Sequence, residues 1–224
     1  MSVLDGFSAR FCTGEWVVDV ALGDCQVTAW DLQGNVVLED GLAGGYYEGP
    51  GELDGPQDRI VSVSRLSPAD EHFYGTGERN GPLNLRGRSV GFWNSDVPGY
   101  GPQQDPLYQS VPFLVGLRGG RAYGLLTDNA HRMRMDLAAT NPGRVVTSAA
   151  GGELDQYLVA GPSVGTVVER YTWLTGRMPL PPRWSLGYHQ CRHSYYPDTE
   201  VLEVTGELRA RDIPADGIWL DIDY

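Results

Sequence analysis

The chain has 224 residues, of which 41% are hydrophobic, and this is enough for a folded core. Its net charge of −12 makes nucleic acid and anionic membrane surfaces poor partners, because binding to phosphate requires clustered Lys and Arg. The sequence has neither a secretion signal nor an apolar run of about 18 residues, so we expect a soluble, cytoplasmic protein.

The three cysteines, Cys12, Cys25 and Cys191, form no CxxC pair, and the four histidines form neither an HxH nor an HxxxH pair. A disulfide framework, a metal site and a cofactor are therefore not expected. For Cys191 a buried structural thiol is the favoured role. The 30 glycines and 15 prolines follow no short repeat and indicate many turns, which favours an all-β body.

Short β-like runs alternate with turn signals from Glu15 to about Ala160, and this spacing predicts a β-sandwich. The pair Gly119-Gly120 predicts a hairpin between two of these runs. The runs are residues 15–22, 24–32, 35–40, 59–66, 111–118, 121–128, 132–138 and 144–150.

Two glycine-containing segments interrupt the runs. FYGTGERNG (73–81) has the spacing GxGxxxG and no following Lys, so a β-turn is favoured over a phosphate-binding loop. Residues 92–101 combine three aromatic residues with Asp96, a composition that suits a sugar-binding loop in which rings such as Trp93 stack on pyranose faces. Composition alone supports an ordinary surface loop equally well.

Residues 162–175 place apolar side chains at helical spacing, and three prolines between 179 and 182 then exclude helix. We therefore predict a domain boundary between residues 177 and 178. A βαβ pattern follows, with strands at 183–191 and 218–224 around a helix at 199–213 capped by Asp198.

A connection of this length predicts parallel strands, as in the first βαβ unit of a (β/α)8 barrel, cut after its second strand. The fold class expected is thus mainly β, a sandwich at 1–177 followed by the start of a barrel at 178–224.

In such barrels ligands bind at the carboxyl ends of the strands. Those ends would carry Arg192 and His193 after the first strand, and Asp221 and Asp223 on the second. Two residues apart on one strand, the two aspartates would have Cα atoms about 7 Å apart. An acid/base pair is the less favoured role for them, and binding of a sugar hydroxyl by one carboxylate is preferred.

Several segments together resemble glycoside hydrolase family 31, the α-glucosidase and α-xylosidase family. The resemblance begins near residue 71 and continues in one collinear order to the last residue. The segments are FYGTGERNGPLNLRGR, WNSDVPGYG, DPLYQSVPFLVGL, RAYGLLTDN, YTWLTGRMPLPPRWSLGYHQCRHSYY and IPADGIWLDIDY.

The resemblance implies a retaining α-glycosidase that acts on terminal non-reducing α-linked sugars. Its catalytic nucleophile and acid/base lie on later barrel strands, so these 224 residues are expected to hold no catalytic residue and to be inactive alone. Asp96 matches the aspartate that the sandwich lends to the active site, and Asp221 matches the glycone-binding aspartate. His193 follows Arg192 where many eukaryotic members have Tyr. The expected substrate-binding residues are Asp221, Asp96, His193, Arg192 and Trp93.

Three alternatives stay open at this point. The sandwich could be a carbohydrate-binding module without catalysis, or it could have a purely structural role. The intact enzyme could also be an α-xylosidase. The expected partner is an oligosaccharide or α-glycoside, and the sequence allows a homo-oligomer.

Overall fold

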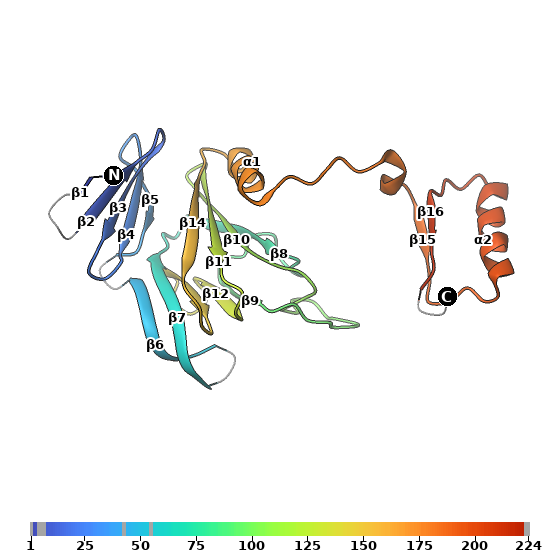
Figure 1. The fold of residues 1–224 in the computed structure, drawn as a ribbon, viewed down its shortest axis with the longest axis horizontal. Coiled ribbons are helices and arrows are strands. Elements are labelled where there is room, and N and C mark those ends of the chain that lie inside the picture. Colours follow the sequence, from blue (N-terminus) through green and yellow to red (C-terminus); the bar gives the residue numbers. More distant parts are fainter. Residues whose placement is uncertain (1, 4–7, 42–43, 54–55, 222–224) are drawn as a thin grey trace. The chain divides into compact units, whose positions relative to one another are not determined.

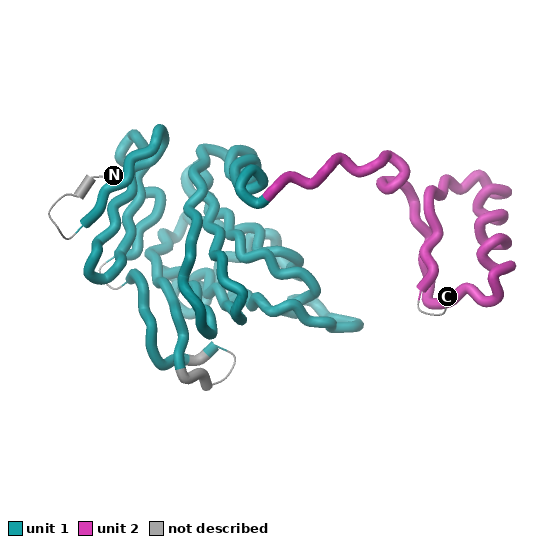
Figure 2. Tube along the Cα trace, in the orientation of Figure 1, with its two compact units in different colours: residues 1–175 teal, residues 176–224 magenta. Residues whose placement is uncertain are grey.

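A computed structural model describes residues 2–3, 8–41, 44–53 and 56–221. The chain forms two compact units, Met1–Thr175 and Gly176–Tyr224, called here the amino-terminal and carboxy-terminal units (Figure 2). None of the helices in the described part of the chain is long and apolar enough to cross a membrane.

The first sheet of the amino-terminal unit is an antiparallel meander (Figure 1). One of its turns is fixed by Asp31, whose carboxylate accepts the N–H groups of Gln33 and Asn35, both at 2.9 Å. Trp16, Ala29 and Leu38 pack from this sheet against Tyr123 of the neighbouring sheet. The strands are β1 (Ser2–Val3), β2 (Ser8–Cys12), β3 (Trp16–Ala21), β4 (Val27–Asp31) and β5 (Val36–Glu39).

Two further antiparallel sheets pack face to face and confirm the predicted β-sandwich. Phe73, Leu114 and Leu125 from one sheet meet Val90, Met135 and other apolar residues from the second in the largest buried cluster. One sheet has the order β14 (Asp155–Ala160), β11 (Arg121–Asp128), β10 (Ser110–Arg118), β8 (His72–Gly77). The other has the order β6 (Gly45–Glu52), β7 (Pro56–Leu66), β13 (Arg144–Ala149), β12 (Met133–Leu137), β9 (Arg88–Phe92).

The glycine-rich segments have different outcomes. The predicted hairpin at Gly119-Gly120 is confirmed, since it joins β10 to β11 and both glycines have positive φ angles, 55° and 76°. The β-turn predicted in 73–81 is wrong for its first half, because Phe73–Gly77 belongs to β8 and pairs with β10. At Gly75 an added Cβ would lie 2.8 Å from the Phe113 carbonyl oxygen, so this glycine allows two strands to approach closely.

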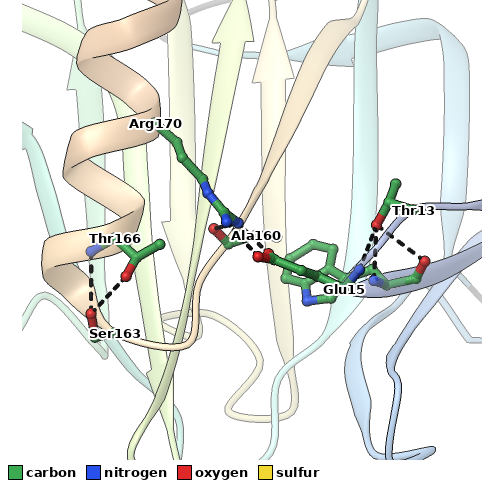
Figure 3. A network of polar contacts seen from close by, with 7 residues as sticks. Thr13, Glu15, Ala160, Ser163, Thr166 and Arg170 are labelled. Carbon is green, nitrogen blue, oxygen red and sulfur yellow. Dashed lines mark hydrogen bonds and ion pairs between the residues drawn. The ribbon is translucent and has the colours of Figure 1, made fainter.

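The predicted helix at 162–175 is confirmed as α1 (Val164–Thr175). Ser163 caps it, since its hydroxyl accepts the Thr166 N–H at 3.2 Å (Figure 3). Val167 is fully buried, and the Arg170 guanidinium pairs with Glu15 and donates to the Ala160 carbonyl at 3.0 Å. These contacts fix the helix against the sheets of its own unit.

The carboxy-terminal unit contains the predicted βαβ pattern, with β15 (His189–Cys191) parallel to β16 (Gly217–Trp219) and α2 (Asp198–Ala210) between them. The first strand is shorter than predicted, because Arg183–Leu186 forms a 3₁₀ turn in which Ser185 donates to the Pro182 carbonyl. Asp198 is the first helical residue and Pro197 occupies the cap position, so the predicted cap is wrong by one residue. The second predicted strand ends at Trp219, and residues 222–224, including Asp223, lie outside the described residues.

Candidate functional site

The loop between β9 and β10, residues 93–109, carries the predicted site residues Trp93 and Asp96, and we call it the site loop. The Trp93 side chain is half-exposed, with the Arg132 guanidinium 5.2 Å from its ring centroid. Asp96 is exposed. Both side chains are thus available to a ligand at the surface of the amino-terminal unit.

Tyr108 organises the tip of the site loop. Its hydroxyl accepts the Val97 N–H at 3.2 Å, and its ring meets Tyr100 edge-on at 6.4 Å between centroids. Desolvation and the hydrogen-bonded carboxylate of Asp96 raise the pKa of Tyr108, while the Val97 N–H opposes this shift. Asp96 and two tyrosine rings therefore lie together, an arrangement that suits a ligand with both hydroxyl groups and an apolar face.

The neck of the site loop is closed by hydrogen bonds. The Ser95 N–H donates to the Leu107 carbonyl at 2.9 Å, and the Asn94 side-chain oxygen accepts the Ser110 N–H at 2.7 Å. Leu107 is buried. The Asn80 side-chain amide donates to the Gly101 carbonyl at 2.8 Å. The loop is long, but its backbone is tied to the sandwich at several points.

The other predicted site residues lie in the carboxy-terminal unit. Cys191 and Trp219 are register partners in the parallel strand pair, so Arg192 and His193 follow one strand end and Asp221 follows the adjacent one. His193 is exposed and Asp221 is partly exposed. This is the strand end at which α/β proteins bind ligands.

Arg192 makes several contacts within its own loop. Its Nε donates to the Ser194 carbonyl at 2.8 Å, its guanidinium lies 4.5 Å from the Tyr195 ring centroid, and it pairs with Glu200. This ion pair, together with the Tyr196 N–H, lowers the pKa of Glu200. Arg192 therefore links the residues that follow His193 to the start of α2.

The structure thus groups Trp93 with Asp96, and Arg192 and His193 with Asp221. The meeting of these two groups in one pocket stays a prediction. Sequence reasoning missed Tyr108, although it lies in the quoted segment DPLYQSVPFLVGL, and it missed Glu200, whose pairing with Arg192 depends on the helix start. The buried thiol predicted for Cys191 is wrong, since this cysteine is exposed at the end of a two-stranded sheet.

Two cavities of about 600 and 620 Å³ lie between the first sheet and the rest of the amino-terminal unit. Their lining, within the described residues, comes from outside the site loop. Asp31 pairs with Arg121 in the first, and Asp40 with Arg65 in the second. Among the described residues, no group of three or more His, Cys, Asp or Glu could hold a metal ion.

Comparison with known families gives matches in both units. Residues 9–136 match the glycosyl hydrolase 31 N-terminal galactose mutarotase-like domain. Residues 178–224 match the glycosyl hydrolases family 31 TIM-barrel domain.

Individual relatives agree with these matches. Alpha-glucosidase 2 of Bacillus thermoamyloliquefaciens is 40% identical over 200 residues, which are 89% of this chain and 24% of that protein. Alpha-xylosidase 1 of Arabidopsis thaliana is 34% identical over 177 residues, 75% of this chain and 19% of its own length. A dextranase structure from Flavobacterium johnsoniae, complexed with glucose, has 29% identity and a TM-score of 0.85, and the match covers 98% of this chain and 26% of that one. The chain therefore spans between 19% and 26% of the length of these relatives.

Proposed function

Since this chain belongs to glycosyl hydrolase family 31, we propose that it is the amino-terminal part of a retaining α-glucosidase-like enzyme that hydrolyses terminal non-reducing α-linked sugars. The observation that carries the proposal is the parallel pair β15 and β16, which lies in the segment matching the family's TIM-barrel domain. We place the boundary between the sandwich domain and the start of the barrel after residue 177.

We propose that Asp221 and His193 bind the sugar from the barrel side, and that Asp96 and Trp93 bind it from the site loop. Arg192 would position His193 through its contacts with Ser194 and Glu200. A charge-assisted hydrogen bond from a sugar hydroxyl to a carboxylate contributes about 1.5–3 kcal/mol where water is excluded. These roles are binding and orientation, while the nucleophile and the acid/base come from outside these 224 residues.

Replacement of Asp221 tests the binding role. In the enzyme that contains this chain, Asp221→Ala should lower kcat/KM for p-nitrophenyl α-glucoside at least about tens-fold, because the lost bond is next to the reacting ring. Glu203→Ala, which removes an exposed carboxylate from α2 of the same unit, is the matched control and should leave kcat/KM unchanged. An unchanged kcat/KM in Asp221→Ala would mean that Asp221 does not bind the sugar.

The purified 224-residue chain should not turn over the same substrate. Turnover by this chain alone would place a catalytic pair within it and overturn the proposed division of roles. Comparing p-nitrophenyl α-glucoside with the α-xyloside, in the enzyme that contains this chain, separates glucosidase from xylosidase specificity. That choice depends on the space beyond the sugar C5 substituent.

A carbohydrate-binding module is the second candidate function, and the half-exposed rings of Trp93, Tyr100 and Tyr108 favour it. It predicts that residues 1–177 bind maltose on their own, whereas the enzyme proposal predicts weak binding because half of the pocket is missing. Isothermal titration of residues 1–177 with maltose decides between them. A sandwich with a purely structural role would bind no sugar in any context.

We further propose that the enzyme acts in carbohydrate metabolism in the cytoplasm. Cys12, Cys25 and Cys191 are exposed free thiols, which a reducing compartment maintains. Cell fractionation tests the location, and light scattering of the purified enzyme tests whether it forms the homo-oligomer that the sequence allows.

A further inference from the structure

A partly buried ion pair joins the site loop to the segment after β8. Arg79 follows β8 and Asp105 lies in the site loop itself, and their side chains, 7% and 17% exposed, meet at 2.5 Å between Nη1 and Oδ1. Exposed ion pairs form easily and stabilise little, whereas a buried pair must offset the loss of hydration of both charges. Its position therefore requires an explanation beyond general stability.

The pair joins three segments of the chain. The second carboxylate oxygen of Asp105 accepts the Gly91 N–H of β9 at 2.6 Å, and Arg79 Nε donates to the Thr76 hydroxyl of β8 at 3.0 Å. The Arg79 guanidinium also lies 5.0 Å from the Phe92 ring centroid. The site loop is thus held to both sheets of the sandwich by one pair of side chains.

The backbone next to Arg79 is strained. Thr76 is buried and has a φ of 71°, in the left-handed region that β-branched residues rarely adopt. Its neighbour Gly77 is also left-handed, and an added Cβ there would lie 2.5 Å from the carbonyl oxygen of Gln109 at the end of the site loop. The hydrogen bond from Arg79 Nε to the Thr76 hydroxyl supports this conformation.

We propose that Arg79 and Asp105 are positioning residues that hold the site loop, and with it Asp96 and Trp93, in the geometry that binds the sugar. This role rests on the proposed function of the site loop. Neither residue needs to touch the substrate, because the pair acts through the loop backbone.

The test uses the enzyme that contains this chain and three variants: Arg79→Met, Asp105→Leu and the double variant. Each single variant leaves one partly buried charge without its partner, so both should lower the melting temperature. Each should also raise KM for p-nitrophenyl α-glucoside about tenfold with kcat within about threefold, because a displaced loop weakens binding of substrate and transition state alike.

The double variant separates positioning from stability. Replacing both buried charges by apolar side chains should restore most of the melting temperature. KM should stay raised, since the Gly91 N–H and the Thr76 hydroxyl still lack their partners. A KM that returns to the wild-type value together with the melting temperature would overturn the positioning role, as would wild-type KM values in both single variants.

Asp40 and Arg65 provide a control, because they form a more deeply buried ion pair in the same unit, at 3.1 Å and away from the site loop. The double variant Asp40→Leu/Arg65→Met should change the melting temperature and leave KM unchanged, and an equal rise in KM would overturn the specific role of Arg79 and Asp105.

Asp96→Ala is measured in the same series. If Asp96→Ala leaves kcat/KM unchanged, the proposed function of the site loop fails. If it lowers kcat/KM while the Arg79 and Asp105 variants behave as wild type, only the positioning role fails.

Discussion

The two units differ in what they bury. In the amino-terminal unit large apolar side chains such as Phe73 and Met135 are completely buried. In the carboxy-terminal unit Tyr195 is the buried apolar side chain among the described residues, while Trp184, Leu186 and Trp219 are more than half exposed. Since burial of apolar surface is the main force that stabilises a fold, the amino-terminal unit carries its own core and the βαβ unit does not.

One glutamate from each unit shows the same contrast in burial. Glu71 is buried in the amino-terminal unit, where it accepts hydrogen bonds from Tyr123 at 2.8 Å and Ser67 at 2.9 Å. Glu200 pairs with Arg192 at the surface of the carboxy-terminal unit. Burial raises the pKa of Glu71, whereas the ion pair lowers the pKa of Glu200. The same type of side chain therefore responds in opposite directions to burial and to an exposed ion pair.

The largest expected difference between the units comes from truncating an apolar side chain. Phe73→Ala should lower the free energy of unfolding of the amino-terminal unit by about 3–5 kcal/mol, because the side chain is fully buried and leaves a cavity. Leu202→Ala, at a residue 70% exposed on α2, should change the free energy of unfolding of the carboxy-terminal unit by less than about 0.5 kcal/mol. Urea denaturation of the 224-residue chain, followed by circular dichroism, measures both. Similar losses of unfolding free energy in the two variants would contradict the proposed difference in burial between the two units.

Sequence reasoning succeeded where the signal is local. Short alternating runs located eight strands, and helical spacing located α1, because burial on one face selects both periods. The eight strands are β3, β4, β5, β7, β10, β11, β12 and β13, whereas β6, β8 and β9 were not predicted. It was less reliable where one residue type serves two purposes. Gly75 and Gly77 were interpreted as turn residues, yet they lie in β8, where the absence of a side chain lets the backbone of β10 approach.

The candidate site shows the same limit. Asp96, Asp221 and His193 could be selected from composition and family resemblance, and their roles stay predictions. Arg79 and Asp105 could not be paired from sequence, because 26 residues separate them and only the packed sandwich brings them together. Long-range ion pairs leave no local pattern in a sequence, whereas strands and hairpins do.

A smaller effect is expected from the buried carboxyl group of Glu71. Its pKa in the folded state is raised above the unfolded value of about 4.5, so its favourable contribution is complete below that pH and is lost as the pH rises through the folded pKa. Glu71→Gln should therefore gain stability relative to the wild type as the pH rises above 4.5. Thermal unfolding at several pH values measures this, and the exposed Glu153→Gln, which removes the same charge, should show no such trend.

The smallest effect is expected from Glu200. Its lowered pKa means that its contribution is present above the unfolded value of about 4.5 and is lost as the pH falls through the folded pKa, the opposite of Glu71. Glu200→Gln should therefore increase hydrogen exchange in α2 (Asp198–Ala210) slightly at neutral pH and not at low pH. Because the pair with Arg192 is exposed, 1 M salt should abolish the difference, since charges are then screened within about 3 Å. A difference that persists in high salt would show that this ion pair is shielded from solvent, and the contrast between the two units would then not extend to their charged groups.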